Sequence, residues 1–415
     1  MKDQQASYPQ LRFKGFTDPW EQRKLSDVAN HRGGTAIEKY FDKDGVYKVI
    51  SIGSYGLNSQ YVDQNIRAIS NEITDGRVVN SGELTMVLND KTANGSIIGR
   101  TLLVEKDNEY VINQRTEIIS PKENFDSNFA YTILNGPFRE KVKRIVQGGT
   151  QIYVNYPAVS NLDLELPKIE EQQKIGTFFK QLDRLITLHQ RKLAKLKELK
   201  QGYLQKMFPQ NGSKFPQLRF AGFSDAWERR KLKSLLKLIV DNRGKTPPTH
   251  ETGSHPMLEV NSLGGLFPNY SKVKKYVNDK VFSSWFRNYL AENDVLFSTV
   301  GNTGLTSLMD KNTNAVIAQN IIAFRFIPEV YPIFAVQMFK QFGNLKKAKR
   351  IEMGAVQPSI KVTQLVKIKY DIPDFDEQKV IGKFLKHTDQ LIAANQRKLE
   401  KLQELKKGYL QKMFC

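Results

Sequence analysis

The sequence predicts an α+β fold that is built twice, as two mixed domains of strands and helices that are each followed by one long helix. A short block near the start of the chain and a longer helical block both recur further along, in the same order. The stretches between them contain β-branched and aromatic runs separated by Gly, Asn and Asp, which indicates mixed domains with much strand. A tandem duplication of this kind predicts a pseudo-two-fold molecule.

The repeat is visible without any alignment to other proteins. PQLRFKGFTDPWEQRKL, residues 9–25, returns as PQLRFAGFSDAWERRKL, residues 216–232, with 13 of 17 positions identical. Residues 167–208 return as residues 373–414, with 26 of 42 positions identical. Chance does not produce two such matches in the same order, so the chain is a duplicated sequence.

The repeated blocks divide the chain into six segments. We expect a first repeat segment, a variable domain and a helix, followed by a linker with the second repeat segment, a second variable domain and a second helix: 1–25, 26–166, 167–208, 209–232, 233–372 and 373–415. Each variable stretch has the size of one domain. Because these stretches differ far more than their flanks, we expect one architecture that presents two different surfaces.

Each helical block carries an apolar stripe of the coiled-coil type. Ile175, Leu182, Leu196 and Tyr203 recur every seven residues, Leu199 lies near an intervening position, and the second block repeats the stripe. A helix of about 36 residues is roughly 54 Å long and cannot bury such a stripe alone. We therefore expect each helix to pack against its own copy.

Two polar residues interrupt the stripes at equivalent places. His189 and Asn395 stand in the middle of the helices, where the seven-residue rhythm expects an apolar residue. A lone polar residue at such a position fixes the register of pairing at some cost in stability. Alternatively, local winding of the helices turns both side chains outward, and the sequence leaves the two interpretations open.

The charge of the chain indicates a polyanionic partner. Lys and Arg number 63 against 43 Asp and Glu, which gives a net charge of +20. Nucleic acid is the interpretation that this charge favours, with an acidic protein partner or simple solubility as alternatives. The single cysteine, Cys415, excludes an internal disulfide, and neither a signal peptide nor an uncharged membrane span is found, so we expect a cytoplasmic protein with no membrane partner.

The sequence offers little catalytic chemistry. The segment RGKTPP lacks the glycine of a phosphate-binding loop, and the five histidines are too scattered for zinc. PDFDEQK, with Asp374, Glu377 and Lys379, resembles a nuclease motif, but its acidic residues are crowded at a helix start, where they favour the helix dipole. We expect no catalytic residue, no metal and no cofactor in this chain.

Polar loops supply the side chains that read base edges, chiefly Arg, Lys, Asn and Gln. In the first domain the candidates are Arg32, Thr35, Asn89, Lys91, Asn94, Gln147, Thr150, Gln151 and Tyr153. In the second domain they are Asn242, Arg243, Lys245, Thr246, Asn261, Ser262, Thr299, Asn302, Thr303, Gln357, Ser359 and Lys361. Each one alone is more readily explained as an ordinary turn residue than as a base contact. What favours the group is the recurrence of polar loops at corresponding places in both halves.

The whole chain resembles the specificity subunit of type I restriction-modification enzymes. The residues that carry the resemblance are the repeated PxLRFxGFxxxWExxKL block, the RGKTP loop, an LP or IP followed closely by EQ, and the terminal LxxLKxGYLQKMF. The resemblance implies two target-recognition domains, each binding one half of an interrupted double-stranded DNA target, and two long antiparallel helices as the spacer. It suggests base contacts by motif only at Arg243, Lys245 and Thr246, and the first half has HRGGTAI there instead.

The resemblance also implies partners and cofactors. Similar subunits bind two adenine-N6 methyltransferase (M) subunits, which carry S-adenosylmethionine, and then restriction (R) subunits, which use ATP and Mg²⁺. Two other functions remain open on the residues alone. They are a coiled-coil scaffold for protein interactions, and a DNA nuclease or methyltransferase with an unrecognised site.

Overall fold

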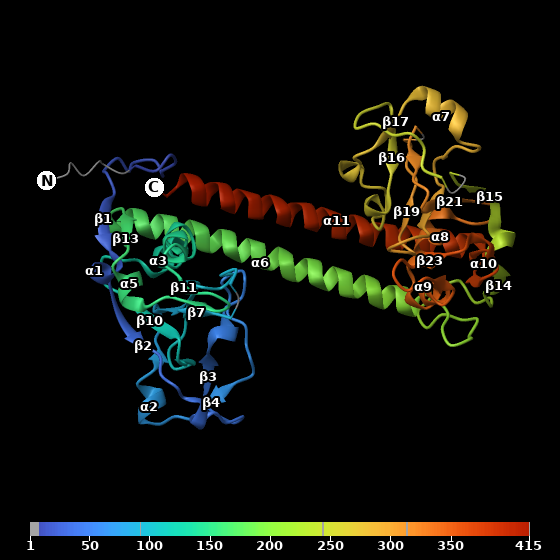
Figure 1. Cartoon of the computed structure of the whole chain (residues 1–415). Coiled ribbons are helices and arrows are strands. Elements are labelled where there is room, and N and C mark those ends of the chain that lie inside the picture. The colour runs from blue at the N-terminus through green and yellow to red at the C-terminus, as the bar shows by residue number, and fades with distance from the viewer. Residues whose placement is uncertain (1–7, 92, 243–244, 313, 415) are drawn as a thin grey trace. The chain divides into compact units, whose positions relative to one another are not determined.

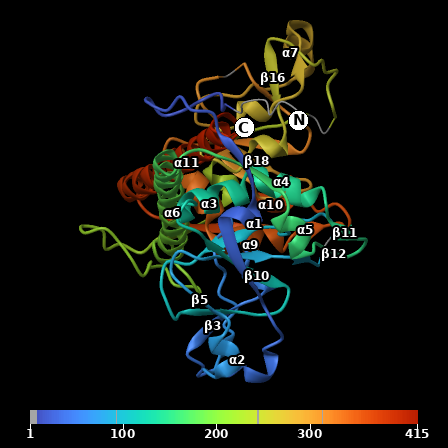
Figure 2. The same cartoon turned by 90° about the vertical axis from the view of Figure 1, so that its left-hand side faces the viewer.

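The computed structural model describes residues 8–91, 93–242, 245–312 and 314–414, which form two compact units (Figures 1 and 2). Residues up to His189 together with those from Lys398 onward form unit 1, and Gln190–Arg397 form unit 2. The long helix α6 (Ile169–Lys206) begins in unit 1 and ends in unit 2. The long helix α11 (Phe375–Lys412) begins in unit 2 and ends in unit 1.

Unit 1 is a mixed α+β body of short elements. Its strands are β1 (Glu21–Lys24), β2 (Ala29–Gly33), β3 (Tyr47–Ile50), β4 (Arg67–Ala68), β5 (Val78–Val79), β6 (Leu84–Val87), β7 (Asn89–Asp90), β8 (Thr101–Leu103), β9 (Tyr110–Ile112), β10 (Thr116–Pro121), β11 (Gln147–Gly148), β12 (Ile152–Tyr153) and β13 (Asp163–Leu166). Its short α-helices are α1 (Leu25–Val28), α2 (Glu72–Asp75), α3 (Ser127–Asn135), α4 (Pro137–Lys143) and α5 (Tyr156–Ser160). The central sheet has the order β2-β10-β6-β8, and a second sheet, β4-β3-β9-β5, lies with α2 at the end of the unit remote from the start of α6 (Figure 1).

Unit 2 repeats this plan. Its strands are β14 (Glu228–Lys231), β15 (Leu236–Val240), β16 (His255–Leu258), β17 (Tyr276–Val277), β18 (Val295–Ser298), β19 (Thr306–Leu308), β20 (Val316–Ile317), β21 (Ile321–Phe326), β22 (Glu352–Met353), β23 (Ser359–Ile360) and β24 (Lys369–Ile372). Its short α-helices are α7 (Asp279–Trp285), α8 (Pro332–Lys340), α9 (Phe342–Lys349) and α10 (Val362–Leu365). The sheet β15-β21-β18-β19 corresponds strand for strand to β2-β10-β6-β8, and the parallel pair β16–β20 corresponds to β3–β9. The predicted duplication of one α+β architecture is confirmed.

The end of each long helix belongs to a hydrophobic core, which explains why the residues MF recur there. In unit 1 the ring of Phe414, just after α11, lies 6.0 Å from Trp20 and 5.7 Å from Phe129. In unit 2 the ring of Phe208, just after α6, lies 5.6 Å from Trp227. Because a buried aromatic ring is worth several kcal/mol, these residues stabilise the folded units rather than act at a surface.

A buried ion pair joins each repeat segment to the start of a long helix. In unit 1, Nε and Nη2 of Arg12 donate to the two carboxylate oxygens of Glu171 at 3.0 and 2.6 Å. In unit 2, the same atoms of Arg219 donate to Glu377 at 2.8 and 2.7 Å. Both carboxylates are buried. The Arg of LRF and the Glu of EQ are therefore partners, which the sequence could not show.

The nuclease-like segment is structural. The Asp374 carboxylate accepts hydrogen bonds from the backbone N–H groups of Asp376 and Glu377 and so caps α11, as its position at a helix start predicts. Glu377 is occupied by Arg219 and by the indole N–H of Trp227. The acidic residues of PDFDEQK hold the fold together.

The long helices pack antiparallel within each unit. In unit 1, Asp183 of α6 pairs with Lys406 of α11 at 2.6 Å, and in unit 2, Lys200 of α6 pairs with Asp389 of α11 at 2.5 Å. The expected place of Leu199 in the apolar stripe is wrong. Leu199 is 43% exposed, whereas Leu193 is buried, because the buried positions follow a spacing that runs through Leu193.

The two polar residues of the stripes differ in burial. Asn395 is buried, and its side-chain amide donates to the Leu391 carbonyl at 2.8 Å. His189 is half-buried. Burial of Asn395 argues against the outward orientation for that residue, and a role of both residues in fixing register stays a prediction.

Candidate nucleic-acid interface

Two polar loops of unit 1 meet in one small sheet, which we call loop surface 1 (residues 89–91, 93–99 and 147–153). Strand β12 pairs with both β11 and β7, so Tyr153 lies opposite Gln147 and Asn89. Strands β7 and β12 are more than sixty positions apart in the sequence, and the fold brings them together. Seven of the predicted contact residues belong to this surface: Asn89, Lys91, Asn94, Gln147, Thr150, Gln151 and Tyr153.

A buried arginine holds the first of these loops from behind. The Arg139 guanidinium, on α4, donates to the carbonyl oxygens of Ile98 at 2.8 Å and of Gly95 and Ser96 at 2.9 Å. The Asp90 carboxylate accepts the N–H of Ile97 at 2.8 Å. Burial lowers the pKa of Arg139 to about 10, so the side chain still carries its charge at neutral pH. Nothing in the sequence distinguishes this residue, because Arg139 lies in a short helix beside ordinary charged residues.

Unit 2 has a corresponding surface, loop surface 2 (residues 299–304 and 352–361). The N–H of Ile360 donates to the Thr299 carbonyl at 2.7 Å, and the N–H of Gly301 donates to the Pro358 carbonyl at 2.8 Å. The Lys349 ammonium, at the end of α9, donates to the Glu352 carboxylate at 2.8 Å and ties the helix to the β22–β23 hairpin. Asn302, Gln357 and Lys361 are exposed on this surface, and Ser359 is half-buried.

Four of the predicted contact residues are buried. Asn242, Ser262, Thr299 and Thr303 are each 5% exposed or less. The Asn242 amide donates to the Ile317 carbonyl at 3.3 Å, and the Thr303 hydroxyl contacts Glu352 and Lys349. Since a side chain that reads a base must reach solvent, these four hold loops in this structure and are not available for direct contact.

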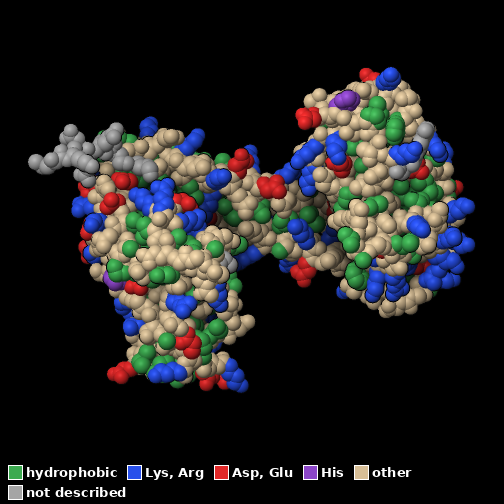
Figure 3. All heavy atoms as spheres, in the orientation of Figure 1, with side chains coloured by type: hydrophobic (Ala, Val, Ile, Leu, Met, Phe, Trp, Pro, Cys, Tyr) green, Lys and Arg blue, Asp and Glu red, His purple; other side chains and the backbone are tan. Residues whose placement is uncertain are grey.

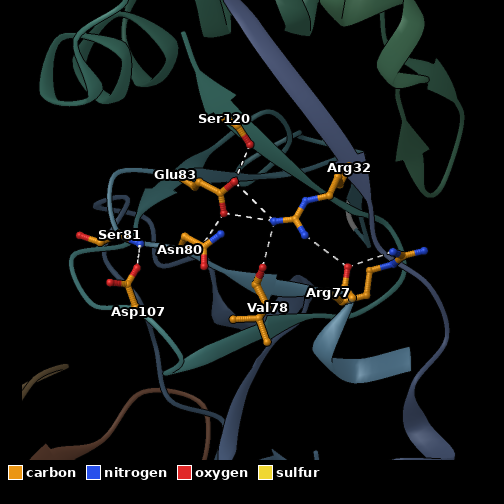
Figure 4. Close-up of polar contacts among 9 residues, drawn as sticks. Arg32, Arg77, Val78, Asn80, Ser81, Glu83, Asp107 and Ser120 are labelled. Carbon is orange, nitrogen blue, oxygen red and sulfur yellow. Dashed lines mark hydrogen bonds and ion pairs between the residues drawn. The ribbon is translucent and has the colours of Figure 1, made fainter. Parts of the chain in front are cut away.

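Arg32 is already engaged by its own domain (Figure 4). Its guanidinium donates to the Val78 carbonyl at 3.0 Å and lies 3.3 Å from the Glu83 carboxylate. Glu83 also accepts the Ser120 hydroxyl at 2.5 Å and the Asn80 backbone N–H at 2.7 Å. This network holds the Arg32 side chain against the segment before β6. Arg32 therefore contributes positive charge, but its guanidinium N–H groups are engaged within the domain rather than free to bind a base.

The remaining predicted residues come from other loops. Thr35 is half-buried and forms an isolated bridge with Asn113. Lys245, Thr246 and Asn261 are exposed. Arg243 lies outside the described residues.

No metal centre is evident in the part of the chain that the structure describes. Among those residues, no group of three or more His, Cys, Asp and Glu side chains is placed to hold a metal ion. No helix in the described ranges is long and apolar enough to cross a membrane.

A duplicated fold with a different polar loop surface in each half is the arrangement of a two-site recognition protein.

Comparison with known proteins agrees with this class. Both halves match the family described as the type I restriction modification DNA specificity domain, over residues 17–198 and 224–404. The type I restriction enzyme MjaVIII specificity subunit of Methanocaldococcus jannaschii is 22% identical over 404 residues, with 94% of this chain and 91% of that protein covered. The putative MjaX specificity subunit of the same organism is 22% identical over 417 residues, with the same coverage.

A solved structure shares the fold. The S subunit of a type I restriction-modification system from M. genitalium superposes with a TM-score of 0.66 at 15% identity, over 98% of this chain and 99% of that one. The family match covers most of the chain, and the chain therefore belongs to the type I restriction-modification DNA specificity family. The resemblance found in the repeated motifs is confirmed, as is the fold of two mixed domains with two long helices.

Proposed function

We propose that the two variable domains, 26–166 and 233–372, each bind one half of an interrupted double-stranded DNA target. The observation that carries the proposal is that two units of the same strand order hold two different polar loop surfaces. Membership of a DNA-specificity family and a net charge of +20 both favour DNA as the ligand. The helical segments 167–208 and 373–415 set the spacing between the two half-sites.

The base contacts come from exposed and half-buried side chains of the two loop surfaces, with contributions from nearby loops. In the first domain they are Asn89, Lys91, Asn94, Gln147, Thr150, Gln151 and Tyr153. In the second domain they are Asn302, Gln357, Ser359 and Lys361, with Lys245, Thr246 and Asn261 from other loops. Amide and guanidinium or ammonium groups are the side chains that distinguish adenine and guanine in the major groove.

The chain itself performs no chemistry in this proposal. It docks two adenine-N6 methyltransferase subunits, which carry S-adenosylmethionine, and restriction subunits, which use ATP and Mg²⁺, in the cytoplasm. The structural use of the nuclease-like segment supports this division, because Glu377 is committed to Arg219. This subunit selects the sequence, and the partners modify or cut it.

Exchange of one variable domain tests the proposal. Residues 26–166 are replaced by the corresponding domain of another family member, and methylated adenines are mapped across the genome in cells that carry each version. We expect one half of the target to change while the other half and the spacer stay the same. Replacement of residues 233–372 is the matched control and should change the opposite half. Methylation that does not depend on this gene, or a target that changes in both halves after one exchange, would contradict the proposal.

A further inference from the structure

The same arginine precedes the hairpin of both loop surfaces. Arg144 is the C-terminal cap residue of α4, with φ −77° and ψ −16°, and Arg350 is the C-terminal cap residue of α9, with φ −67° and ψ −18°. The β11–β12 hairpin begins three residues after Arg144, and the β22–β23 hairpin begins two residues after Arg350. The two arginines thus occupy equivalent places with the same backbone conformation.

Both helices are anchored in the same way, which fixes where the arginines lie. The Lys141 ammonium donates to the Asp163 carbonyl of β13 at 2.7 Å, and the Lys347 ammonium donates to the Lys369 carbonyl of β24 at 3.2 Å. The next residue in each helix, Val142 or Ala348, is buried in the core. Each arginine is therefore presented from a rigid element next to a loop surface.

Neither arginine serves the fold in any visible way. Arg144 and Arg350 are exposed, and among the described residues no ion pair or side-chain hydrogen bond involves either guanidinium. A lysine precedes each arginine, and the nearest acidic side chains in sequence are occupied, since Glu140 pairs with Lys143 and Glu352 with Lys349. In Figure 3, Lys and Arg side chains gather on the face of unit 2 around α9.

The hairpins that follow the arginines have diverged. One has the sequence QGGTQIY (residues 147–153) and the other EMGAVQPSI (residues 352–360), whereas the KRI that precedes them is the same in both halves. A group that reads bases has to differ between two unlike half-sites. A group that binds the sugar-phosphate backbone does not, because every sequence presents the same phosphates.

We propose that Arg144 and Arg350 each bind a backbone phosphate of the DNA beside the half-site that the adjacent hairpin reads. The pair supplies a contact that is independent of sequence and that sets each hairpin at a fixed height over the base edges. Guanidinium suits the task, since its planar fork binds two phosphate oxygens at once. The proposal rests on the proposed function, because it assumes that the loop surfaces face DNA.

An acidic surface of a partner protein is the competing ligand for these arginines. The position directly before the hairpins favours DNA, because a partner that covered both arginines would lie against the segments that differ most between the halves. A phosphate contact contributes to the salt dependence of DNA binding, whereas a protein contact holds the partner in the complex. The experiment therefore measures both the salt dependence of DNA binding and the retention of the methyltransferase.

The test uses the full chain assembled with its methyltransferase partner. Arg144→Gln, Arg350→Gln and the double variant are compared by titration with a duplex that carries the mapped target and with a mixed-sequence duplex, over a range of KCl concentrations. The logarithm of the DNA-binding constant falls linearly with the logarithm of the KCl concentration. Each substitution should make this negative slope shallower by about one, and the double variant should make it shallower by about two. Affinity for both duplexes should fall by the same factor, and Arg350→Lys should retain most of the slope.

Matched controls come from another arginine that recurs in both halves. Arg23 lies on β1 and Arg230 on β14, away from the hairpins in sequence, and replacement by Gln removes the same charge. These variants should leave the slope unchanged. An equal change in slope for the controls would overturn the proposal, because the effect would then be one of net charge.

Three further outcomes decide the matter. A changed target sequence in Arg144→Gln or Arg350→Gln would overturn the proposal, because it would make the arginine a base reader. An unchanged slope together with loss of methyltransferase from the complex would overturn it in favour of the protein partner. If the unsubstituted complex showed no preference for the mapped target, the proposed function would fail. A lowered slope on mixed-sequence DNA would still support the phosphate contact.

Discussion

In unit 1 the loop surface is held by a buried cation, whereas in unit 2 an apolar side chain stands at the same place. Arg139 of α4 donates three hydrogen bonds to carbonyls of its loop, and its counterpart in α9 is Leu345. Leu345 packs against Gly304, where φ is +81° and an added Cβ would lie 2.5 Å from the leucine Cδ1. Hydrogen bonds from a buried guanidinium hold the loop in unit 1, whereas apolar packing holds the loop in unit 2.

The ion pairs at the starts of the long helices show the opposite behaviour. Arg12–Glu171 and Arg219–Glu377 have the same geometry in both units, within a few tenths of an ångström. The ion pairs are the same in both units, whereas the residues that support the loops differ. Side chains that assemble the core and the helices were kept in both copies, and side chains that support the loops were free to change with the loops.

The largest expected effect is loss of one of these ion pairs. Arg219→Met leaves the Glu377 carboxylate buried with the Trp227 indole N–H but without its cationic partner, which should destabilise unit 2 by about 3–5 kcal/mol. Arg12→Met should destabilise unit 1 by a similar amount. Scanning calorimetry of the two variants measures both losses, and a markedly unequal pair of values would break the equivalence of the two units. The double variant Arg219→Met with Glu377→Gln should recover part of the loss, because the buried charge is then removed.

Much of the fold could be predicted because the duplication exposes its parts. Repetition of residues 9–25 and 167–208 singled out both long helices and the two variable domains. It could not show that Arg12 meets Glu171, since nothing in a sequence reports contacts between residues that lie far apart. Leu199 was assigned to the apolar stripe wrongly, because two leucines in nearby turns fit the seven-residue rhythm almost equally well and only packing distinguishes them.

The candidate interface was harder to predict. Residue type alone singled out Asn242 and Thr303 as readily as Asn302 and Gln357, but the first two are buried and the last two are exposed. Asn and Thr serve equally well as turn residues, as buried hydrogen-bonding groups and as base readers. Burial decides among these uses, and burial depends on strand pairings that the sequence does not report.

A smaller effect should separate the two loop surfaces. Arg139→Met removes three hydrogen bonds from the loop of surface 1, so recognition of one half-site should weaken by about tenfold, or about 1.4 kcal/mol, while the other half-site is unaffected. Arg139→Lys should restore part of the loss. Binding is measured on duplexes in which one half-site at a time is replaced by unrelated sequence.

Leu345→Met in α9 is the matched control for Arg139→Met. It preserves volume and polarity, so it should change the recognition of neither half-site appreciably. Weakening of both half-sites by Arg139→Met would show general unfolding of the complex rather than loss of loop support. Circular dichroism of the variant, recorded in parallel, distinguishes general unfolding directly.

The smallest expected effect is a pH dependence confined to unit 2. Lys340 ends α8, and burial together with the nearby charge of Lys200 lowers the pKa of Lys340 to about 8. The corresponding residue at the end of α3 is Asn135, which does not titrate. A charged Lys340 costs stability below pH 8. Between about pH 8 and the ordinary lysine pKa of 10.5 the unfolded chain binds the extra proton, so stability should rise with pH there.

The measurement compares melting temperatures at pH 7 and pH 9.5. Lys340→Met also removes two hydrogen bonds to the carbonyls of Gly264 and Gly265, so the informative quantity is how its effect changes with pH. From pH 7 to pH 9.5, the melting temperature of the unsubstituted protein should rise by a few degrees relative to that of Lys340→Met. Asn135→Met should change the melting temperature of unit 1 by the same amount at both. A constant difference for Lys340→Met would mean that Lys340 keeps an ordinary affinity for its proton, and the two units would then not differ in this pH dependence.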